Sequence, residues 1–230
     1  MTRLHDSSQE IKRRCPLGPV DTLGIATWES KENGSRCMVA IRGVTTGDIP
    51  VYQSTMGSPS SWEYEDYTRC STSEAHKDIM GAMSLYQEDE EFKKEYLVAV
   101  NYQMGESAVA TSGFLFFSEP DSDQVGIANP ALQVGYFLHP YFRGKGIARA
   151  AVRLLVEKAF EVLAKPHTGH KTFKKYASVY ALVYSGNTRS IHLLESLGFT
   201  RDPGYAKTAL VQCEPMIEYR YVKTQDRYSR

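Results

Sequence analysis

Residues 134–148 read VGYFLHPYFRGKGIA, a strand-like segment followed by two glycines and the start of a helix. The apolar run from Leu132 to Leu138 predicts a strand. A long helix is predicted over about residues 144–164, because charged side chains recur every four positions on one side and the opposite side is almost wholly apolar. Gly144 and Gly146 lack a Cβ, so the backbone between the two elements can turn tightly and approach a ligand closely.

This junction is suited to bind an anion. The first N–H groups of a helix have no partner within the helix, and the helix dipole favours negative charge beside them. Arg143 and Lys145 add positive charge. Two common nucleotide-binding patterns do not fit, because the third glycine of the dinucleotide fingerprint is missing and no Ser or Thr follows Lys145. The residues alone therefore predict a phosphate site and leave the nucleotide open.

The same stretch resembles the acetyl-CoA motif of the GNAT superfamily of N-acetyltransferases, whose core is Arg/Gln-x-x-Gly-x-Gly/Ala. Arg143, Gly146 and Ala148 fill its three defining positions. A second segment, NTRSIHLLESLGF at residues 187–199, resembles a segment of the branch that acetylates the N-termini of ribosomal proteins. Residues 41–48, IRGVTTGD, are similar to the first strand and turn of that branch. The two motifs stand in the expected order with one strand between them, which a chance strand–glycine–helix pattern would not explain.

The resemblance implies where acetyl-CoA binds. The strand ending at Leu138 would splay from its neighbour at residues 176–184, and backbone groups of Phe137 and Leu138 would pair with the pantetheine arm. Asn187 and Ser190 on the short helix would contact the pantetheine or phosphate end. The pyrophosphate would lie on backbone N–H groups of the glycine loop, from Arg143, Gly144, Lys145, Gly146, Ile147 and Ala148.

The resemblance also implies direct attack of an amine on the thioester, with no covalent enzyme intermediate. The backbone N–H of Leu138 would polarise the thioester carbonyl. Tyr205 is the candidate acid for the leaving thiolate, and a packing role for this tyrosine is equally open. No Asp or Glu lies in the strand that ends at Leu138, so the general base is not identified and a water chain could serve. His139 is expected to form a structural corner.

The remaining chain predicts one mixed α/β (α+β) domain, which the resemblance makes a GNAT-type domain with a central, mostly antiparallel, twisted and splayed sheet. Its expected parts are an N-terminal extension (1–36), the acetyltransferase domain (37–222) and a C-terminal tail (223–230). Asp48 is expected to cap the helix that follows it. Strands are predicted at residues 37–41, 96–100, 109–117, 132–138, 176–184 and 215–222, and helices at about 49–56, from 73 onward, 144–164 and 187–197.

Composition narrows the function classes further. The chain has 230 residues, with 27 Lys and Arg against 27 Asp and Glu, so nothing in the charge balance suggests nucleic acid or a polybasic membrane surface. No stretch is long and apolar enough to span a bilayer. The four cysteines have no Cys-x-x-Cys spacing, and His167 and His170 lie in a loop, so no metal site is expected. We expect a cytoplasmic protein, monomeric or homodimeric.

The acyl acceptor stays open at this point. It is an amine of a small molecule or a protein N-terminus, and the aromatic-rich residues 62–67, which could wall a compact pocket, favour a small molecule. Relatives that act on protein N-termini often carry Glu two residues after the last alanine of the motif, whereas this chain has Arg149-Ala150 there. The alternative is a CoA-binding protein of the same fold with a non-acetylating or regulatory role.

Overall fold

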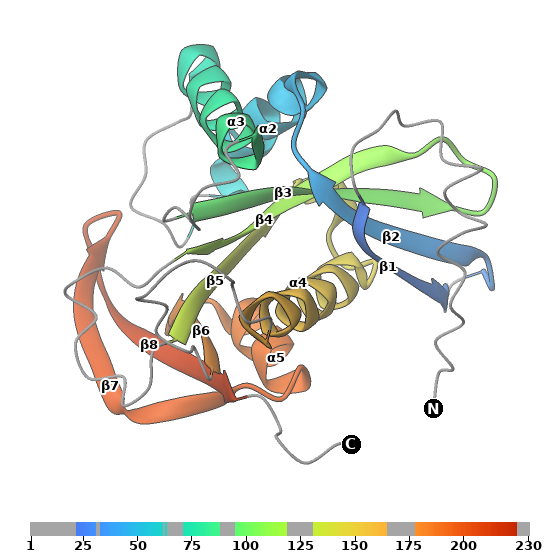
Figure 1. The fold of residues 1–230 in the computed structure, drawn as a ribbon. Coiled ribbons are helices and arrows are strands. Elements are labelled where there is room, and N and C mark those ends of the chain that lie inside the picture. The colour runs from blue at the N-terminus through green and yellow to red at the C-terminus, as the bar shows by residue number, and fades with distance from the viewer. Residues whose placement is uncertain are drawn as a thin grey trace.

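A computed structural model describes residues 22–30, 33–61, 63, 71–87, 95–118, 131–164 and 178–224. These residues form an eight-stranded sheet in the order β1-β2-β3-β4-β5-β6-β8-β7, in which only β5 and β6 are parallel neighbours (Figure 1). The strands are β1 Thr22–Glu29, β2 Arg36–Gly43, β3 Glu95–Met104, β4 Ala110–Ser118, β5 Ala131–Leu138, β6 Ser178–Tyr184, β7 Thr200–Val211 and β8 Glu214–Thr224. The α-helices are α2 Ile49–Met56, α3 Thr72–Gln87, α4 Ile147–Ala164 and α5 Thr188–Ser196.

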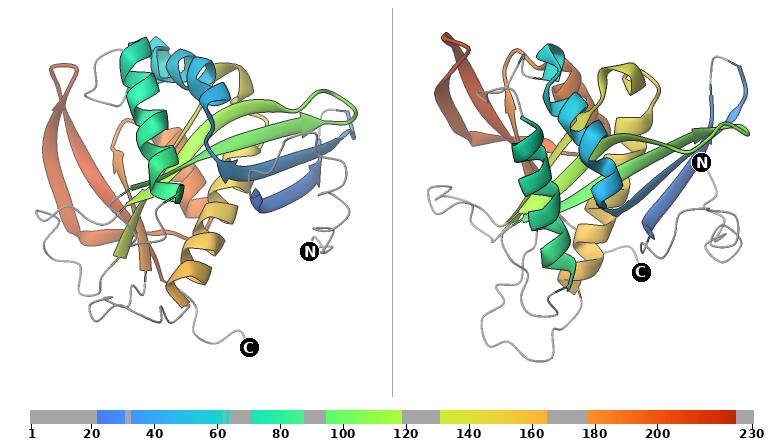
Figure 2. Two further views of the ribbon diagram at one scale, coloured as in Figure 1. Left: turned by 45° about the horizontal axis from the view of Figure 1, so that its top comes forward. Right: turned by 90° about the horizontal axis from the view of Figure 1, so that it is seen from above.

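The helices cover both faces of the sheet, with α4 and α5 on one face and α2 and α3 on the other (Figure 2). Successive side chains of β3 point to opposite faces of the sheet, so this one strand contributes to the cores on both faces. Val98 and Val100 belong to the core beneath α4, whereas Leu97 and Ala99 belong to the core beneath α2 and α3. This two-sided burial explains why the central strands read as nearly continuous apolar runs.

The predicted strands and helices are present, and the fold class is confirmed. The strands at residues 37–41, 96–100, 109–117, 132–138, 176–184 and 215–222 correspond to β2, β3, β4, β5, β6 and β8. The long helix begins at Ile147 and not at residue 144, because Gly144 and Gly146 adopt φ values of 77° and 80°, outside the helical region.

The sequence does not predict β1 or β7. Strand β1 lies within the segment assigned to an extension and pairs with β2 from Thr22 to Glu29, so the sheet begins before residue 37. Strand β7 contains Pro203 and Gly204, which are turn residues, and its ladder with β8 is interrupted between Arg201 and Ala206. Pairing with a partner strand, and not local sequence, produces both elements.

Asp48 has a different role from the predicted helix cap. No side-chain hydrogen bond from Asp48 caps α2. Its carboxylate instead accepts two hydrogen bonds from the Arg42 guanidinium, at 2.7 and 2.8 Å, and one from the backbone N–H of Thr45. Arg42 and Asp48 are both buried, so the pair joins β2 to the start of α2 within the core.

Within the described ranges, no helix is long and apolar enough to cross a membrane.

Candidate active site

Strands β5 and β6 form a fork. Their parallel pairing runs only from Ala131 to Gln133 on β5, opposite residues 178–180 of β6. At the narrow end the Tyr180 hydroxyl donates a hydrogen bond of 3.1 Å to Oε1 of Gln133 and joins the two strands. Beyond Gln133, the described residues provide no strand partner for this side of β5 as far as Leu138. The fork therefore exposes one edge of β5 to a ligand that can pair with backbone.

The register with β4 determines which backbone groups of β5 face the fork. The N–H of His139 donates to the carbonyl of Ser112 at 3.0 Å, and the pairing continues without a shift along β5. Because hydrogen-bonded pairs alternate in an antiparallel ladder, the N–H and C=O of Phe137 face β4, and those of Tyr136 and Leu138 face the fork. The Phe137 carbonyl is so near β4 that a Cβ on Gly113 would lie 2.5 Å from it. The backbone groups of Phe137, which were predicted to pair with the pantetheine arm, therefore face β4, and those of Tyr136 face the fork.

The glycine loop follows directly from the open end of β5. His139 Nδ1 accepts a hydrogen bond from the Tyr141 N–H and caps the short 3-10 helix Pro140–Phe142. The left-handed conformations of Gly144 and Gly146 then turn the chain into α4, and the buried side chain of Ile147 anchors the first turn of that helix. The backbone of the loop is thereby placed at the N-terminus of an 18-residue helix.

Arg143 connects the loop to other parts of the site and does not extend freely into solvent. Its Nε donates to the Leu138 carbonyl at 3.2 Å, and its two terminal nitrogens donate to Ser60 and Ser61, also at 3.2 Å. Burial and the nearby positive charge of Arg189 lower the pKa of Arg143. Two guanidinium groups from different elements thus converge beside the loop, and an anion bound there would relieve their repulsion.

Helix α5 contributes Asn187 and Ser190 at the other side of the fork. Oδ1 of Asn187 accepts the Ser190 N–H at 3.1 Å and forms the N-cap of the helix. The Tyr136 hydroxyl lies 2.5 Å from Oγ of Ser190, and burial raises the pKa of Tyr136 to about 12. Tyr136 therefore bridges β5 and α5, a contact that the sequence does not predict because 54 residues separate the two side chains.

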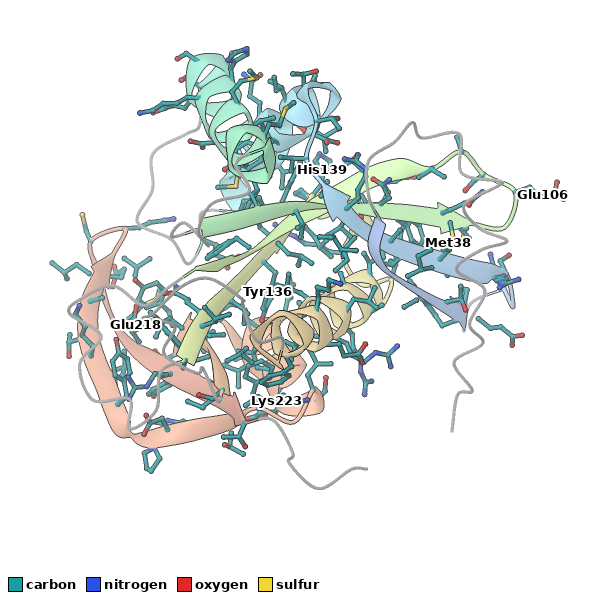
Figure 3. The ribbon with its side chains drawn as sticks, in the orientation of Figure 1. Met38, Glu106, Tyr136, His139, Glu218 and Lys223 are labelled. Atoms are coloured by element: carbon teal, nitrogen blue, oxygen red, sulfur yellow. The ribbon has the colours of Figure 1, made fainter. Side chains whose placement is uncertain are left out.

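Tyr205 lies on β7 and contacts the β8 strand. Its hydroxyl donates a hydrogen bond of 2.6 Å to Oε1 of Glu218, and the Arg220 guanidinium carbon lies 4.5 Å from the centre of its ring. Figure 3 shows Glu218 on the β8 side of the fork and Tyr136 on the β5 side. In the sequence, apolar and polar residues alternate over residues 215–222. This alternation already indicates that the side chains of Glu218 and Arg220 lie on the same face of a strand.

The structure thus brings most of the predicted site residues to one end of the fork. Leu138 and the loop from Arg143 to Ala148 meet the N-terminal turn of α5, which carries Asn187 and Ser190. Lys145 is exposed, with its ammonium 4.5 Å from the centre of the Tyr141 ring. The segment at residues 62–67 lies outside the described residues apart from Glu63, as do His167 and His170.

Residues 39–200 match the model of the acetyltransferase (GNAT) domain. The chain belongs to the GNAT acetyltransferase family. The match spans the fork, the glycine loop and α5, so the prediction of a GNAT acetyltransferase is confirmed. No curated protein sequence matches the chain.

Solved GNAT structures share the fold of this family member at low sequence identity. RimJ from Mycobacterium smegmatis, in complex with CoA-disulfide, superposes with a TM-score of 0.62 at 15% identity, covering 91% of this chain and 90% of the other. Spermidine N-acetyltransferase from Vibrio cholerae, with CoA and spermine, gives 0.61 at 15% identity, covering 83% and 97%. A GNAT acetyltransferase from Bacillus anthracis gives 0.60 at 16% identity, covering 81% and 94%.

Proposed function

We propose that this protein transfers an acetyl group from acetyl-CoA to an amine, by direct attack within a ternary complex. The observation that carries the proposal is the open edge of β5, which leads directly into a glycine loop at the N-terminus of α4. One side of this site suits a ligand with amide groups, and the other suits a pyrophosphate. Pantetheine and pyrophosphate are joined in that order in CoA.

The donor site uses backbone groups more than side chains. The N–H groups of residues 144–148 bind the pyrophosphate at the positive end of the α4 dipole, whereas the N–H of Arg143 already donates to the Pro140 carbonyl. The side chains of Arg143 and Arg189 supply further positive charge. The backbone groups of Tyr136 and Leu138 pair with the pantetheine arm in the fork. Asn187 and Ser190 contact the arm from α5 through their polar side chains.

The chemical step needs an electrophile, a nucleophile and a proton for the leaving thiolate. The Leu138 N–H faces the fork and polarises the thioester carbonyl, while its own carbonyl is held by Arg143. The neutral amine attacks the carbonyl carbon, the carbon–sulfur bond breaks as the amide forms, and the surplus proton on the nitrogen passes to water. Tyr205 is the proposed proton donor to the thiolate, and its hydroxyl hydrogen is directed at Glu218 in the structure.

The acceptor class follows from neither the fold nor the donor site. The structures that share this fold include a spermidine N-acetyltransferase and RimL, a ribosomal L7/L12 alpha-N-protein acetyltransferase. We propose a small-molecule amine as the first class to test, with protein N-termini as the second. We further propose that the protein works in the cytoplasm, since Cys37 and Cys213 are free thiols. For its oligomeric state we propose a monomer or a homodimer.

Binding and turnover test the proposal separately. Acetyl-CoA should raise the melting temperature, by a stabilisation that grows with the logarithm of its concentration over its dissociation constant, because it binds only the folded chain. Release of free CoA thiol against a panel of amines then reports transfer. Absence of a thermal shift at saturating acetyl-CoA would refute the donor site. A clear shift without thiol release, for any amine or peptide, would instead favour a CoA-binding protein with a regulatory role.

A further inference from the structure

Glu218 points to the face of the sheet opposite α4 and α5. Its neighbour Tyr219 pairs with Val183 of β6, and both belong to the core beneath those helices. Side chains alternate along a strand, so Glu218 and its ladder partner Tyr184 point the other way. The pyrophosphate loop leads into α4 on the first face, so a second substrate can approach the fork from the face that carries Glu218.

Glu218 also lies at the wide end of the fork. The pairing of β5 with β6 ends at Gln133 and Tyr180, so Tyr184, four residues further along β6, lies at the open end of the fork. Tyr184 pairs with Glu218 in the next ladder. Glu218 therefore lies beside the open end of the fork on the far side of β6, and Figure 3 shows it in the β7–β8 part of the sheet, apart from His139, which follows β5.

The Glu218 carboxylate is held in place but is not neutralised. Oε1 accepts the Tyr205 hydroxyl at 2.6 Å, and the side chain is partly buried. Among the described residues, no second group hydrogen-bonds to Glu218 and none forms an ion pair with it. Lys207, which stands directly opposite on β7, is exposed and makes no such pair. One carboxylate oxygen therefore remains to accept hydrogen bonds from a ligand.

The neighbouring Arg220 does not cancel this charge, because another carboxylate already neutralises it. Asp202 accepts hydrogen bonds of 2.9 and 2.6 Å from Arg220, whose guanidinium also lies against the Tyr205 ring. The interruption in β7 places Asp202 and Tyr205 around this one arginine. Arg220 is thus already paired with Asp202, and Glu218 keeps its charge without an ion pair, since Lys207, on the same face across the ladder, makes no ion pair with it.

We propose that Glu218, oriented by Tyr205, is the carboxylate that binds the ammonium group of the acyl acceptor. A free primary amine is protonated in neutral solution, so it reaches the fork as a cation. A fixed carboxylate at the wide end of the fork attracts and positions that cation by a charge-assisted hydrogen bond. The bound ammonium then releases one proton to water, which restores the nitrogen lone pair for attack on the thioester. The acceptor is accordingly a protonated primary amine. This inference rests on the proposed acetyl transfer and adds the group that selects the acceptor.

The test compares a charged nucleophile with an uncharged one in the same enzyme. The charged probes are spermidine, cadaverine, benzylamine and a dipeptide with a free N-terminus. Hydroxylamine, which is uncharged at mildly alkaline pH, is the neutral probe. Glu218→Gln should raise the KM of the best amine and lower its kcat/KM by about tenfold or more. Hydroxylamine turnover and acetyl-CoA affinity should stay within about twofold of wild type.

Two further variants keep the test decisive. Glu214→Gln, at the exposed start of β8, is the matched control and should leave all parameters unchanged. Tyr205→Phe keeps the ring beside Arg220 and releases Glu218, so it should reproduce part of the KM effect even if Glu218→Gln folds poorly. Equal losses with hydroxylamine and amines in Glu218→Gln, or no loss with either, would overturn the inference. Turnover of hydroxylamine but of no amine would overturn it as well, whereas no turnover of any nucleophile would refute the acetyl transfer itself.

Discussion

The hydroxyl of Tyr136 on β5 lies 2.5 Å from Oγ of Ser190 on α5, and this contact spans the fork between β5 and β6. The two elements flank the proposed pantetheine channel from opposite sides. Because Asn187 caps the same helix through the Ser190 N–H, the contact also fixes the position of the N-terminal turn of α5. On this face, the width of the proposed pantetheine channel therefore depends on the hydroxyl group of Tyr136.

Tyr136→Phe should weaken acetyl-CoA binding without abolishing the fold. Loss of the hydroxyl releases Ser190 and removes one buried hydrogen bond, worth about 1 kcal/mol of unfolding free energy. We expect the dissociation constant for acetyl-CoA, measured by calorimetry, to rise by about threefold to tenfold. Tyr141→Phe is the control, because Tyr141 is 71% exposed. An unchanged dissociation constant in Tyr136→Phe would show that Ser190 does not need this contact to bind the ligand.

Gly146→Asp should abolish acetyl-CoA binding. The substitution places a negative side chain where the pyrophosphate is proposed to bind, at a residue with φ of 80°. Gly105→Asp is the matched control, since Gly105 has φ of 57° and open space around it in the β3–β4 turn. Both variants carry similar backbone strain of about 1 kcal/mol, so only the first should lose the thermal shift with acetyl-CoA. Equal shifts in both variants would place the pyrophosphate elsewhere.

The sequence predicted the elements whose signals are local. The glycine turn before α4 and the short helix predicted from about residue 187 depend on signals within a few residues, and both are present. Strand β1 and the interrupted strand β7 depend on their partner strands, so their own residues carried too little pattern to reveal them. The sequence likewise did not predict the contacts of Tyr136 with Ser190 and of Tyr205 with Glu218, because each contact joins two different elements of the fold.

The assignment of backbone groups shows a second limit of sequence reasoning. Phe137 and Tyr136 are adjacent, and both are aromatic residues in a strand that was predicted correctly. Which of the two directs its N–H and C=O into the fork depends only on the register with β4. A shift of one residue in the pairing of β5 with β4 would turn the backbone groups of Phe137 into the fork and those of Tyr136 towards β4. The residues of the motif alone do not determine this register.

Asp48→Asn should destabilise the fold in a pH-dependent manner. Burial alone would raise the pKa of Asp48, but the hydrogen bonds and charge of Arg42 outweigh it, so the net pKa is lowered. A lowered carboxyl pKa stabilises the fold above its unfolded value of about 4, and this stability is lost as pH falls through the folded pKa. We expect Asp48→Asn to cost about 3 kcal/mol at neutral pH, because Arg42 remains buried without its partner.

Denaturant unfolding at several pH values measures this effect. The difference between wild type and Asp48→Asn should be constant above about pH 5 and should shrink in acid, where wild-type Asp48 becomes protonated. Glu157→Gln is the control, because its pair with Arg153 is exposed at 3.8 Å and contributes less than about 1 kcal/mol. A difference that persists undiminished in strong acid would mean that packing around the pair, and not its charge, stabilises this part of the core.

Tyr205→Phe separates the two roles that the structure gives this residue. As the proton donor to the thiolate, Tyr205 should affect kcat for every nucleophile, by about a hundredfold if protonation limits the rate. As the group that orients Glu218, it should instead raise KM for charged amines and spare hydroxylamine. Steady-state kinetics with both kinds of nucleophile distinguish these outcomes, with the melting temperature as a check on folding.

With both proposed roles, Tyr205→Phe should lower kcat for every nucleophile and should raise KM for the charged amines alone, since the Tyr205 hydroxyl also donates to Glu218 at 2.6 Å. Glu218→Gln combined with Tyr205→Phe gives the decisive comparison. If Tyr205 acts only through Glu218, the double variant should be no worse than Glu218→Gln alone. Additive losses in kcat/KM would show that Tyr205 acts on the reacting atoms independently of Glu218, as the proposed acid does.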